Sequence, residues 1–330
     1  RMPTLEDVAR LAGVSRATAS RAIIEPTKVS PERRALVEDA MARLGYVPNA
    51  AARSLVTQRT DSIAVLVPEP SGMVFVDPFF QAVISGANSE LADTMYQLVL
   101  LIGDSTGHMK RVRHYLRSRL VDGAVVVSHH GSDGVVESAV DAGLPLVLVG
   151  RPFAPGLDVP YVDVDNLTGG KIATERLIAQ GCRRIGIVTG PLDMSAGRDR
   201  YEGFRLAMEA AGLRVAGIWH GQFDRPSGAA TGARIEPGEV DGLFVCNDLM
   251  ALGVMDSLAA SGISVPDDVK VVGYDAISLG EHATPPLTTV TNPASEMAAL
   301  ATSMLLEQLK TGVRPQSCEL QPVLVERASG

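Results

Sequence analysis

The sequence predicts an all-α helix-turn-helix headpiece followed by an α/β two-lobed body that contains two Rossmann-like parallel sheets. Three observations lead to this fold class. Short helical patterns fill the first 45 residues, apolar strand-like runs then alternate with helical stretches in two successive sets, and positive charge gathers at the N-terminus. With 330 residues the chain exceeds one compact domain, so we expect two or three.

The first two predicted helices are short and close together. Thr4 and Asp7 form a capping-box pattern at the start of the first helix, and Gly13 ends it. Ser15 is the expected cap of the second helix, which covers residues 16–23. Its buried face is expected to consist of Ala19, Ala22 and Ile23. Two helices joined by a tight glycine-containing turn are typical of a helix-turn-helix.

A third helix and a short alanine-rich segment complete the N-terminal part. The helix begins at Ser30-Pro31, where a cap precedes a proline in the first helical position, and it ends at Gly45. The segment from Asn49 to Leu55 has an asparagine cap but no apolar face that could fix it by packing. Because isolated helices of this length rarely form in water, we expect it to be a marginal helix on its own.

The predicted strands of the body are runs of almost continuous apolar residues. The first set covers residues 63–67, 97–102, 123–127 and 145–149, the second covers 184–188, 242–246 and 269–273, and a last strand is expected at 319–325. Such strands, alternating with helices, indicate parallel sheets that are covered on both faces. Because ligands of these sheets bind at the carboxyl ends of the strands, polar residues there are candidates for a site.

Charge separates the N-terminal part from the body. Residues 1–59 carry ten Lys/Arg and six Asp/Glu, a net charge of +4, which leaves −12 for the rest of a chain with a net charge of −8. A basic head on an acidic body predicts that only the head contacts nucleic-acid phosphates.

The second helix carries the candidate DNA-reading residues. Its N-terminal end and exposed face offer Arg16, Ala17, Thr18, Ser20 and Arg21. An arginine can bond guanine through two parallel contacts, and a small apolar residue can meet a thymine methyl group. Taken alone, the same pattern also fits an ordinary solvated helix face.

Longer motifs resemble those of the lactose-repressor (LacI) family. In the N-terminal part these are Thr4–Ser15 and Gly45–Leu55, and the resemblance runs from residue 4 to residue 59. In the body they are Val164–Gly170, Arg198–Phe204, Cys246–Gly253, Val272–Asp275 and Pro285–Thr289. The resemblance covers almost the whole chain and implies a body with the fold of periplasmic binding proteins.

The resemblance implies three parts with separate tasks. Residues 1–47 form the DNA-binding headpiece, residues 48–60 the hinge helix and linker, and residues 61–330 the effector-binding and dimerisation domain. We expect the N-lobe of that domain to take about residues 61–162 and 291–320, and the C-lobe about residues 163–290 and 321–330.

For the headpiece and hinge, the resemblance implies a defined set of DNA contacts. The implied residues are Thr4, Ser15, Arg16, Ala17, Thr18, Ser20, Arg21, Asn49, Ala52, Arg53 and Leu55. Arg16 and Ala17 occupy the positions that select the half-site. The hinge segment folds only on the operator, and Leu55 falls on the leucine that wedges into the minor groove. Ala19 and Ala22 stand where valine is usual, which should leave docking intact.

For the body, the resemblance implies an effector site around Arg200, Asn247 and Asp275, each expected just beyond a strand. Together these side chains offer donors and acceptors suited to vicinal hydroxyls. Phe223 occupies the position of an aromatic residue that packs on the ligand ring. Structural alternatives exist, because Asp275 could cap a turn and Arg200 could pair with an acidic residue of its own helix. These acidic residues are Asp199 and Glu202.

Weaker candidates lie at the ends of other strands and at the start of a helix. They are Phe79, Phe80, Ser128, Arg151 and Asp165. His129 also ends a strand, but a lone histidine there is more often a loop residue. The position at which purine-binding relatives carry an arginine holds Met194, which cannot bond the edge of a purine. The expected effector is therefore a mono- or oligosaccharide inducer rather than a nucleobase.

Two other classes of protein are disfavoured. An enzyme lacks support, because the chain has no phosphate-binding glycine motif, nucleophile elbow or metal-spaced cluster, and we expect no cofactor or metal. Asp163 and Asp165 would point opposite ways on an extended segment. An exported binding protein is disfavoured by the headpiece and by a charged N-terminus unlike a signal peptide. The three cysteines, Cys182, Cys246 and Cys318, suit a reducing cytoplasm, and no segment predicts a membrane span.

The expected partners are a near-palindromic double-stranded DNA operator and a second copy of the chain. The sequence ends five residues past the last predicted strand without a leucine-heptad tail, so a homodimer is expected. The alternative is a regulator that binds DNA only with a corepressor or a protein partner.

Overall fold

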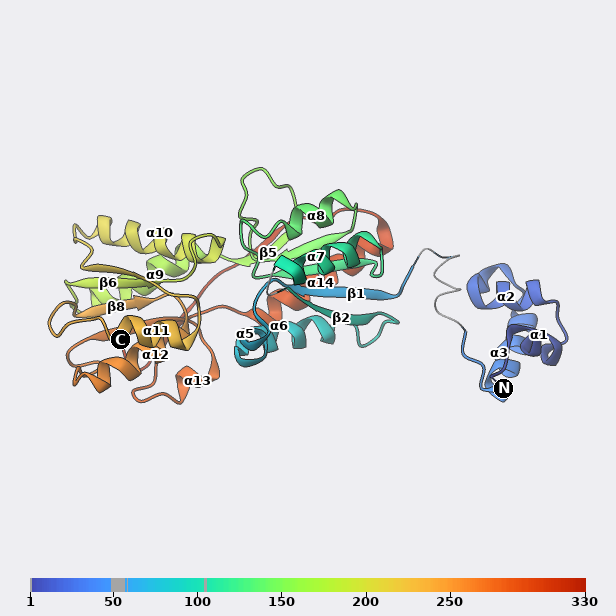
Figure 1. The fold of residues 1–330 in the computed structure, drawn as a ribbon, viewed down its shortest axis with the longest axis horizontal. Helices are drawn as coiled ribbons and strands as arrows, with labels where there is room; N and C mark the ends of the chain where they lie inside the picture. Colours follow the sequence, from blue (N-terminus) through green and yellow to red (C-terminus); the bar gives the residue numbers. More distant parts are fainter. Residues whose placement is uncertain (1, 49–56, 58, 104–105) are drawn as a thin grey trace. The chain divides into compact units, whose positions relative to one another are not determined.

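The computed structural model describes residues 2–48, 57, 59–103 and 106–330 of the chain. It contains two compact units, Arg1–Ser62 and Ile63–Gly330. Figure 1 shows that the N-terminal unit consists of helices and that the larger unit combines helices with strands. The predicted hinge segment, residues 49–55, lies outside the described residues.

The N-terminal unit is a bundle of three α-helices. These are α1 (Leu5–Ala12), α2 (Arg16–Ile24) and α3 (Pro31–Leu44), with a 3₁₀ turn η1 (Pro26–Lys28) before the last. Gly13 and Gly45 end α1 and α3 in the left-handed conformation, which glycine adopts without steric cost. The small core includes Val8, Ala19 and Val37, one from each helix. The three predicted helices are confirmed, and α2 runs one residue further than expected.

The body contains two six-stranded sheets. The first has the order β11-β5-β4-β3-β1-β2 and the second β12-β10-β9-β8-β6-β7. Strands of the first sheet are β1 (Ser62–Val67), β2 (Gln97–Ile102), β3 (Gly123–Val127), β4 (Leu146–Val149), β5 (Tyr161–Val164) and β11 (Cys318–Leu320). Strands of the second are β6 (Ile185–Thr189), β7 (Gly217–His220), β8 (Gly242–Val245), β9 (Lys270–Asp275), β10 (Thr288–Thr291) and β12 (Leu324–Val325). Pairs such as β1–β3 and β8–β9 are parallel, whereas β12 runs antiparallel to β10.

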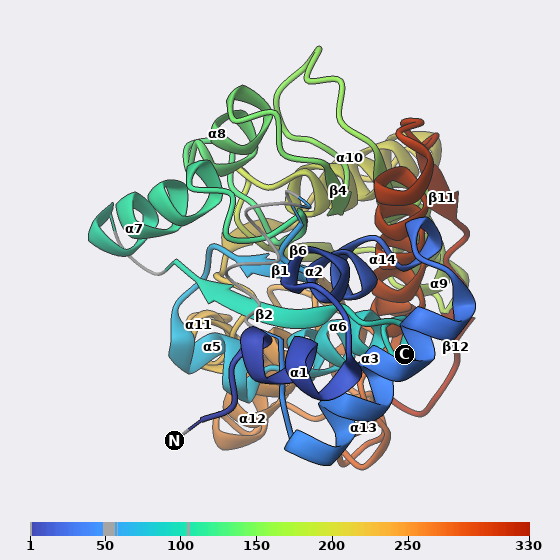
Figure 2. The ribbon, with the colours of Figure 1, turned by 90° about the vertical axis from the view of Figure 1, so that its right-hand side faces the viewer.

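Helices cover both faces of each sheet. In the N-lobe, α6 (Pro78–Ser89) and α14 (Ala294–Thr311) pack on one face, and α7 (Thr106–Arg117) and α8 (Val135–Asp141) pack on the other. Figure 2 shows α7 and α8 on the opposite side of β2 from α6. In the C-lobe, α9 (Asn166–Ala179) and α10 (Ser195–Ala210) lie on one side, and α11 (Arg225–Gly232) and α12 (Asp248–Ala260) on the other (Figure 1). The short helices α5 (Ser71–Val76) and α13 (Ser278–Glu281) follow β1 and β9.

Two sequence predictions about the body need correction. The last strand, expected over residues 319–325, is two strands in different sheets, because the chain crosses between the lobes after Leu320. The lobe boundary expected after residue 162 falls inside β5, which stays in the first sheet through Val164. The strands β5, β7 and β10 were not predicted. Over the described part of the chain, no helix has the length and apolar character needed to span a membrane.

Candidate functional site

The exposed face of α2 carries the candidate DNA-reading residues. Arg16, Ala17 and Arg21 are exposed, Thr18 and Ser20 are half-buried, and the intervening Ala19 and Ala22 lie in the core. The Nε atom of Arg16 lies 2.7 Å from Oε1 of Glu6 on α1. Because exposed ion pairs of this kind contribute about 0–1 kcal/mol, Arg16 can leave Glu6 for a base at little cost.

Two of the predicted DNA contacts serve as helix caps. The Thr4 hydroxyl accepts from the backbone N–H of Asp7, and the backbone N–H of Thr4 donates to Asp7 Oδ2, which completes the predicted capping box. The Ser15 side chain accepts from the N–H of Thr18 at 3.1 Å. Since the first turn of α2 contains no acidic residue, its N-terminus presents a partial positive charge that suits a phosphate. The other predicted contacts, Asn49, Ala52, Arg53 and Leu55, lie outside the described residues.

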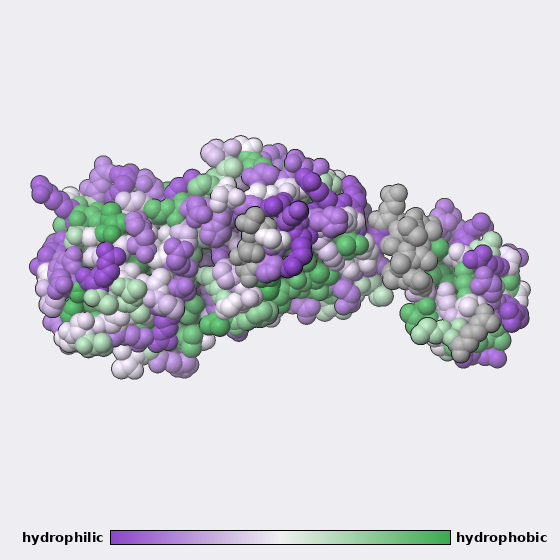
Figure 3. Space-filling view, viewed as in Figure 1, coloured by the Kyte–Doolittle hydropathy of each residue, from purple (hydrophilic) through white to green (hydrophobic). Residues whose placement is uncertain are grey.

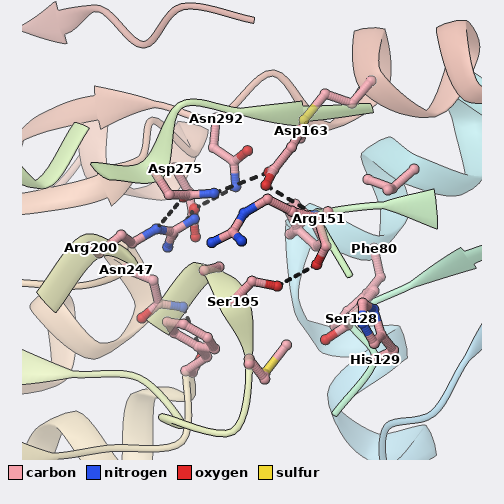
Figure 4. Close-up of a pocket in the computed structure, with 18 of the residues that line it drawn as sticks. Phe80, Ser128, His129, Arg151, Asp163, Ser195, Arg200, Asn247, Asp275 and Asn292 are labelled. Carbon is pink, nitrogen blue, oxygen red and sulfur yellow. Dashed lines mark hydrogen bonds and ion pairs between the residues drawn. The ribbon is translucent and has the colours of Figure 1, made fainter. Parts of the chain in front are cut away.

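The second site is a pocket between the two lobes of the body, at the carboxyl ends of the strands. The N-lobe contributes Met73, Asp77, Phe79, Phe80, Ser128, His129, Val149, Gly150, Arg151, Asp163 and Met297. The C-lobe side contributes Asn166, Met194, Ser195, Ala196, Arg200, Phe223, Asn247, Asp275 and Asn292. Figure 4 shows Ser128 and His129 on one side of this pocket, across from Arg200 and Asp275.

Arg200 is the central buried cation of the pocket. It lies inside α10 rather than directly after a strand, and only 4% of the residue is exposed. Its guanidinium donates to Asn166 Oδ1 at 2.8 Å and to the Cys246 carbonyl at 2.6 Å, and it lies 3.5 Å from Asp275 Oδ1. The two own-helix partners that the sequence left open, Asp199 and Glu202, pair with other arginines.

Asn247 and Phe223 form the adjoining wall. Asn247 caps α12, because its Oδ1 accepts from the N–H of Met250, while its Nδ2 donates to the Phe223 carbonyl at 2.8 Å. Phe223 has a φ of +61°, and the guanidinium carbon of Arg200 lies 5.6 Å from the centre of its ring. The aromatic face predicted at Phe223 therefore lines the pocket beside the polar groups.

Asp275 ends β9 in a strained conformation that neighbouring groups hold. Its φ of +108° is unusual for a residue other than glycine. Asp248 is fully buried and accepts from the Thr289 hydroxyl at 2.6 Å and from the N–H of Ile277 at 2.9 Å. Asn292 donates to Asp275 Oδ1 at 2.9 Å. These bonds hold the chain just after Asp275 and the carboxylate itself, which lies 3.5 Å from Arg200.

The N-lobe wall mixes aromatic and polar side chains. The rings of Phe79 and Phe80 meet edge to face with centres 5.3 Å apart. The Ser128 hydroxyl donates to Glu69, and His129 accepts the N–H of Phe153 through Nε2. Arg151 forms an ion pair across the cleft with Asp199 of α10. All of these predicted N-lobe candidates therefore line one pocket.

Asp165 was predicted as an effector-binding residue, and the structure places it elsewhere. It does not line the pocket, because its side chain caps α9 by accepting from the N–H of Thr168 at 2.9 Å. Asp163, two residues earlier in β5, faces the pocket instead and accepts from the N–H of Arg151. Asn166, Ser195 and Asn292 were also missed. The run of polar residues after β5 was a usable signal for Asp163 and Asn166, whereas Asn292 follows a strand that was not predicted.

Burial sets the charge state of the pocket acids. Burial raises the pKa of Asp77 to about 7, and the nearby charge of Asp275 adds to this effect. Burial likewise raises the pKa of Asp163 to about 6. Burial also raises the pKa of Asp275, although the charge of Arg200 opposes this. Both cations of the pocket, Arg151 and Arg200, already have a carboxylate partner.

Comparison with known proteins shows which protein families this chain is similar to. Residues 4–49 match the model of bacterial regulatory proteins of the lacI family, and residues 174–330 match that of a periplasmic binding protein-like domain. The HTH-type transcriptional regulator CelR of Thermobifida fusca is 42% identical over 337 residues, with 100% of this chain and 99% of CelR covered. The ribose operon repressor of Escherichia coli is 34% identical, with 99% and 100% covered.

Solved structures agree with these sequence matches. A transcriptional regulator CelR–cellobiose complex superimposes with a TM-score of 0.76 and 39% identity, covering 99% of this chain and 100% of that one. The lac repressor dimer bound to operator and the anti-inducer ONPF gives a TM-score of 0.83 at 23% identity, with 100% and 99% covered, which supports the shared fold.

Proposed function

Because the chain belongs to the lacI family of bacterial regulatory proteins, we propose that it is a transcription repressor whose operator affinity is controlled by a sugar bound between the lobes of its body. The observation that carries this proposal is the convergence of Arg200, Asn247 and Asp275 with Phe223 in one pocket. Polar groups that both donate and accept, beside an aromatic face, suit a ring with several hydroxyl groups. The relatives that it matches are transcriptional regulators, and we propose the same role, and no catalytic one, for this chain.

The charge of the pocket favours an uncharged sugar. Arg200 is compensated by Asp275 and Arg151 by Asp199, while Asp77 and Asp163 add carboxyl groups without a cation of their own. A phosphorylated or acidic sugar would therefore meet no free cation in a buried site, where unpaired charge is costly. The related regulator CelR has been solved in complex with cellobiose, so this neutral disaccharide is the first candidate for an inducer.

The DNA-binding part of the proposal rests on the headpiece. We propose that α2 enters the major groove with Arg16 and Ala17 at the bases, and that a dimer reads a near-palindromic operator. An apolar band over α5, α6 and β2 in Figure 3 is a fitting dimer surface, since Phe75, Val76 and Met95 are exposed there. A bacterial regulator that binds operator DNA would act in the cytoplasm.

The direct test is fluorescence anisotropy with labelled genomic fragments upstream of sugar-utilisation genes. Specific binding should weaken steeply as salt rises. Cellobiose, ribose and glucose are then added separately to the complex. Release of DNA by a sugar identifies an inducer, and tightening identifies a corepressor. The proposal is wrong if the protein binds no fragment specifically, or if no sugar changes either DNA binding or the melting temperature.

Asp199 offers a sharper test of the charge argument. Asp199→Asn frees Arg151 from its partner without altering a residue that lines the pocket. We expect the affinity for a 6-phosphorylated sugar to rise about tenfold, with little change for the neutral sugar. Glu202→Gln is the matched control, because it makes the same charge change on α10 at an exposed pair with Arg205. Equal behaviour of both variants would contradict the charge argument.

A further inference from the structure

A histidine between two carboxylates joins the lobes at one side of the pocket. His130 follows β3 in the N-lobe, and its Nε2 lies 2.9 Å from Oε1 of Glu69, which follows β1. Its Nδ1 lies 2.9 Å from Oδ2 of Asp193, which follows β6 in the C-lobe. The backbone adds a second bond between the lobes, because the N–H of Gly131 donates to the Asp193 carbonyl at 2.9 Å.

The geometry defines the protonation state of this histidine. An ionised carboxylate only accepts hydrogen bonds, so both ring nitrogens must carry a proton to bond both partners. His130 is therefore an imidazolium in this arrangement. The hydrogen bond to Glu69 is the main reason that the pKa of His130 rises to about 9, and burial opposes the rise. Glu69 is buried, whereas Asp193 is half exposed, so the partner in the C-lobe is the one that can separate.

The N-lobe half of the cluster is held independently of the C-lobe. The N–H of His130 donates to Asp133 Oδ2 at 2.7 Å, which fixes the loop that carries the ring. Ser128 donates to the same Glu69 oxygen that faces the ring. The charged groups around the imidazolium are thus Glu69 and Asp133 from its own lobe and Asp193 from the other, with His129 as its neutral neighbour, since burial lowers the pKa of His129.

The cluster is adjacent to the pocket on both sides of the cleft. Ser128 and His129, directly before His130, line the pocket, and so do Met194 and Ser195, directly after Asp193. When His130 and Asp193 meet, these two loops are brought together over the same cavity. Separation of the pair would move pocket residues of both lobes apart. The pair therefore connects the width of the cleft with the shape of the ligand site.

We propose that His130 and Asp193 are positioning residues that form a charged clamp across the cleft and favour its closed form, so that effector binding and lobe closure are coupled. The proposal rests on the proposed function, in that the ligand of the pocket is the effector. The clamp itself touches no ligand. It acts by bringing Ser128 and His129 of the N-lobe to Met194 and Ser195 of the C-lobe.

The first test needs no effector. In protein labelled at its histidine rings, NMR titration should give the His130 ring a pKa well above that of an ordinary histidine. Asp193→Asn should lower this pKa measurably, because one carboxylate is lost, and small-angle X-ray scattering should show a wider body. Asp256→Asn is the matched control, since it breaks an exposed pair with Arg225 in the same lobe. An unchanged His130 pKa in Asp193→Asn overturns the clamp.

The second test measures coupling to the ligand. With cellobiose as the probe in calorimetry at pH 7, Asp193→Asn should weaken binding about tenfold, mainly through faster release. Wild-type affinity should also fall as pH rises towards about 9 and level off above it, whereas the affinity of the variant should stay flat. A purely structural role would not produce this difference in pH profile, so matching profiles overturn the proposal. If wild-type protein binds no sugar, the proposed function fails, while the NMR result still decides whether the clamp exists.

Discussion

At the scale of single residues, the arrangement of the pocket depends on which side chains Arg200 pairs with. The sequence offers it two acids on its own helix, yet the structure pairs it with Asp275, 75 positions away, and stacks it 3.7 Å from the centre of the Tyr274 ring. The choice follows from burial. Asp199 is already paired with Arg151 and Glu202 with Arg205, so a guanidinium on the inner face of α10 must find its acceptors in the core.

Arg200→Ala should abolish the response to the effector and leave operator binding intact. The change leaves Asp275 buried without its cation, and breaking a buried pair in this way typically costs about 3–5 kcal/mol. The headpiece is a separate unit and keeps its own core. Calorimetry with the effector and anisotropy with the operator measure the two effects. Arg205→Ala, at an exposed pair on the same helix, is the control, and a normal response of Arg200→Ala would refute the assignment.

Asp77 predicts a pH dependence of stability. Its pKa in the folded protein is about 7, above the ordinary value of 3.8, so folding takes up a proton between these values. The cost of ionising the buried group is therefore absent below about pH 4, grows as pH rises, and is complete above about pH 7. Asp77→Asn keeps the helix cap and should raise the free energy of unfolding by about 2–4 kcal/mol at pH 8, with no gain at pH 4. Denaturant titrations at the two pH values measure this, and an equal gain at both would contradict it.

At the scale of helices, Arg200 is placed by the close approach of α9 and α10. A Cβ atom on Gly203 would lie 2.1 Å from the Leu167 carbonyl, and one on Gly170 would lie 2.3 Å from the Arg200 carbonyl. The two helices therefore touch through glycines. This contact brings Arg200 within 2.8 Å of Asn166 at the start of α9.

Gly203→Ala should push α10 away from α9 and disturb the pocket from outside. We expect a loss of about 1–3 kcal/mol in the free energy of unfolding, as for other overpacked sites, and an effector affinity about tenfold weaker. Gly72→Ala in α5 is the matched control, because a Cβ there meets no atom within 4 Å. Thermal unfolding and calorimetry measure both effects. Equal results for the two variants would show that the helix contact does not position Arg200.

The hinge segment gives a prediction that rests on sequence alone. Leu55 falls on the position that resembles the family's minor-groove wedge, and an inserted aliphatic side chain stabilises kinked DNA at a specific site. Leu55→Ala should therefore weaken binding to the operator far more than binding to unrelated DNA of the same length. Anisotropy with both DNAs at one salt concentration measures the ratio. An equal loss on both would rule out the wedge.

How far the sequence predicted the elements depends on burial. The strands β1, β3, β6 and β8 were found because both of their faces are buried and nearly every residue is apolar. In contrast, β7 at a sheet edge has only one buried residue, and β10 is rich in threonine, so neither shows a continuous apolar run. Asn292 was missed for the same reason, since it follows β10. Asp165 was misassigned, because an acid that caps a helix and an acid that faces a ligand look alike in sequence.

At the scale of the whole molecule, the proposed operator and effector sites lie in different units of the chain, so their coupling would be a property of the protein as a whole. The motifs that resemble the LacI family predicted both sites, but not the bonds across the cleft. His130 and Asp193 are 63 positions apart, and nothing in the sequence indicates that they meet. Such contacts decide which lobe arrangement is favoured, and so how strongly a ligand can shift it.

Coupling between the sugar and the operator requires that each changes the affinity for the other reciprocally. This relation can be measured without knowing which residues connect the two sites. If the effector weakens operator binding by a given factor, the operator must weaken effector binding by the same factor. Anisotropy with and without saturating sugar gives the first factor, and calorimetry of the sugar with and without saturating operator gives the second. In Asp193→Asn both factors should change together, because the clamp biases the lobes and not either site alone. If the common factor in Asp193→Asn equals that of the wild-type protein, the clamp does not contribute to the coupling between sugar and operator.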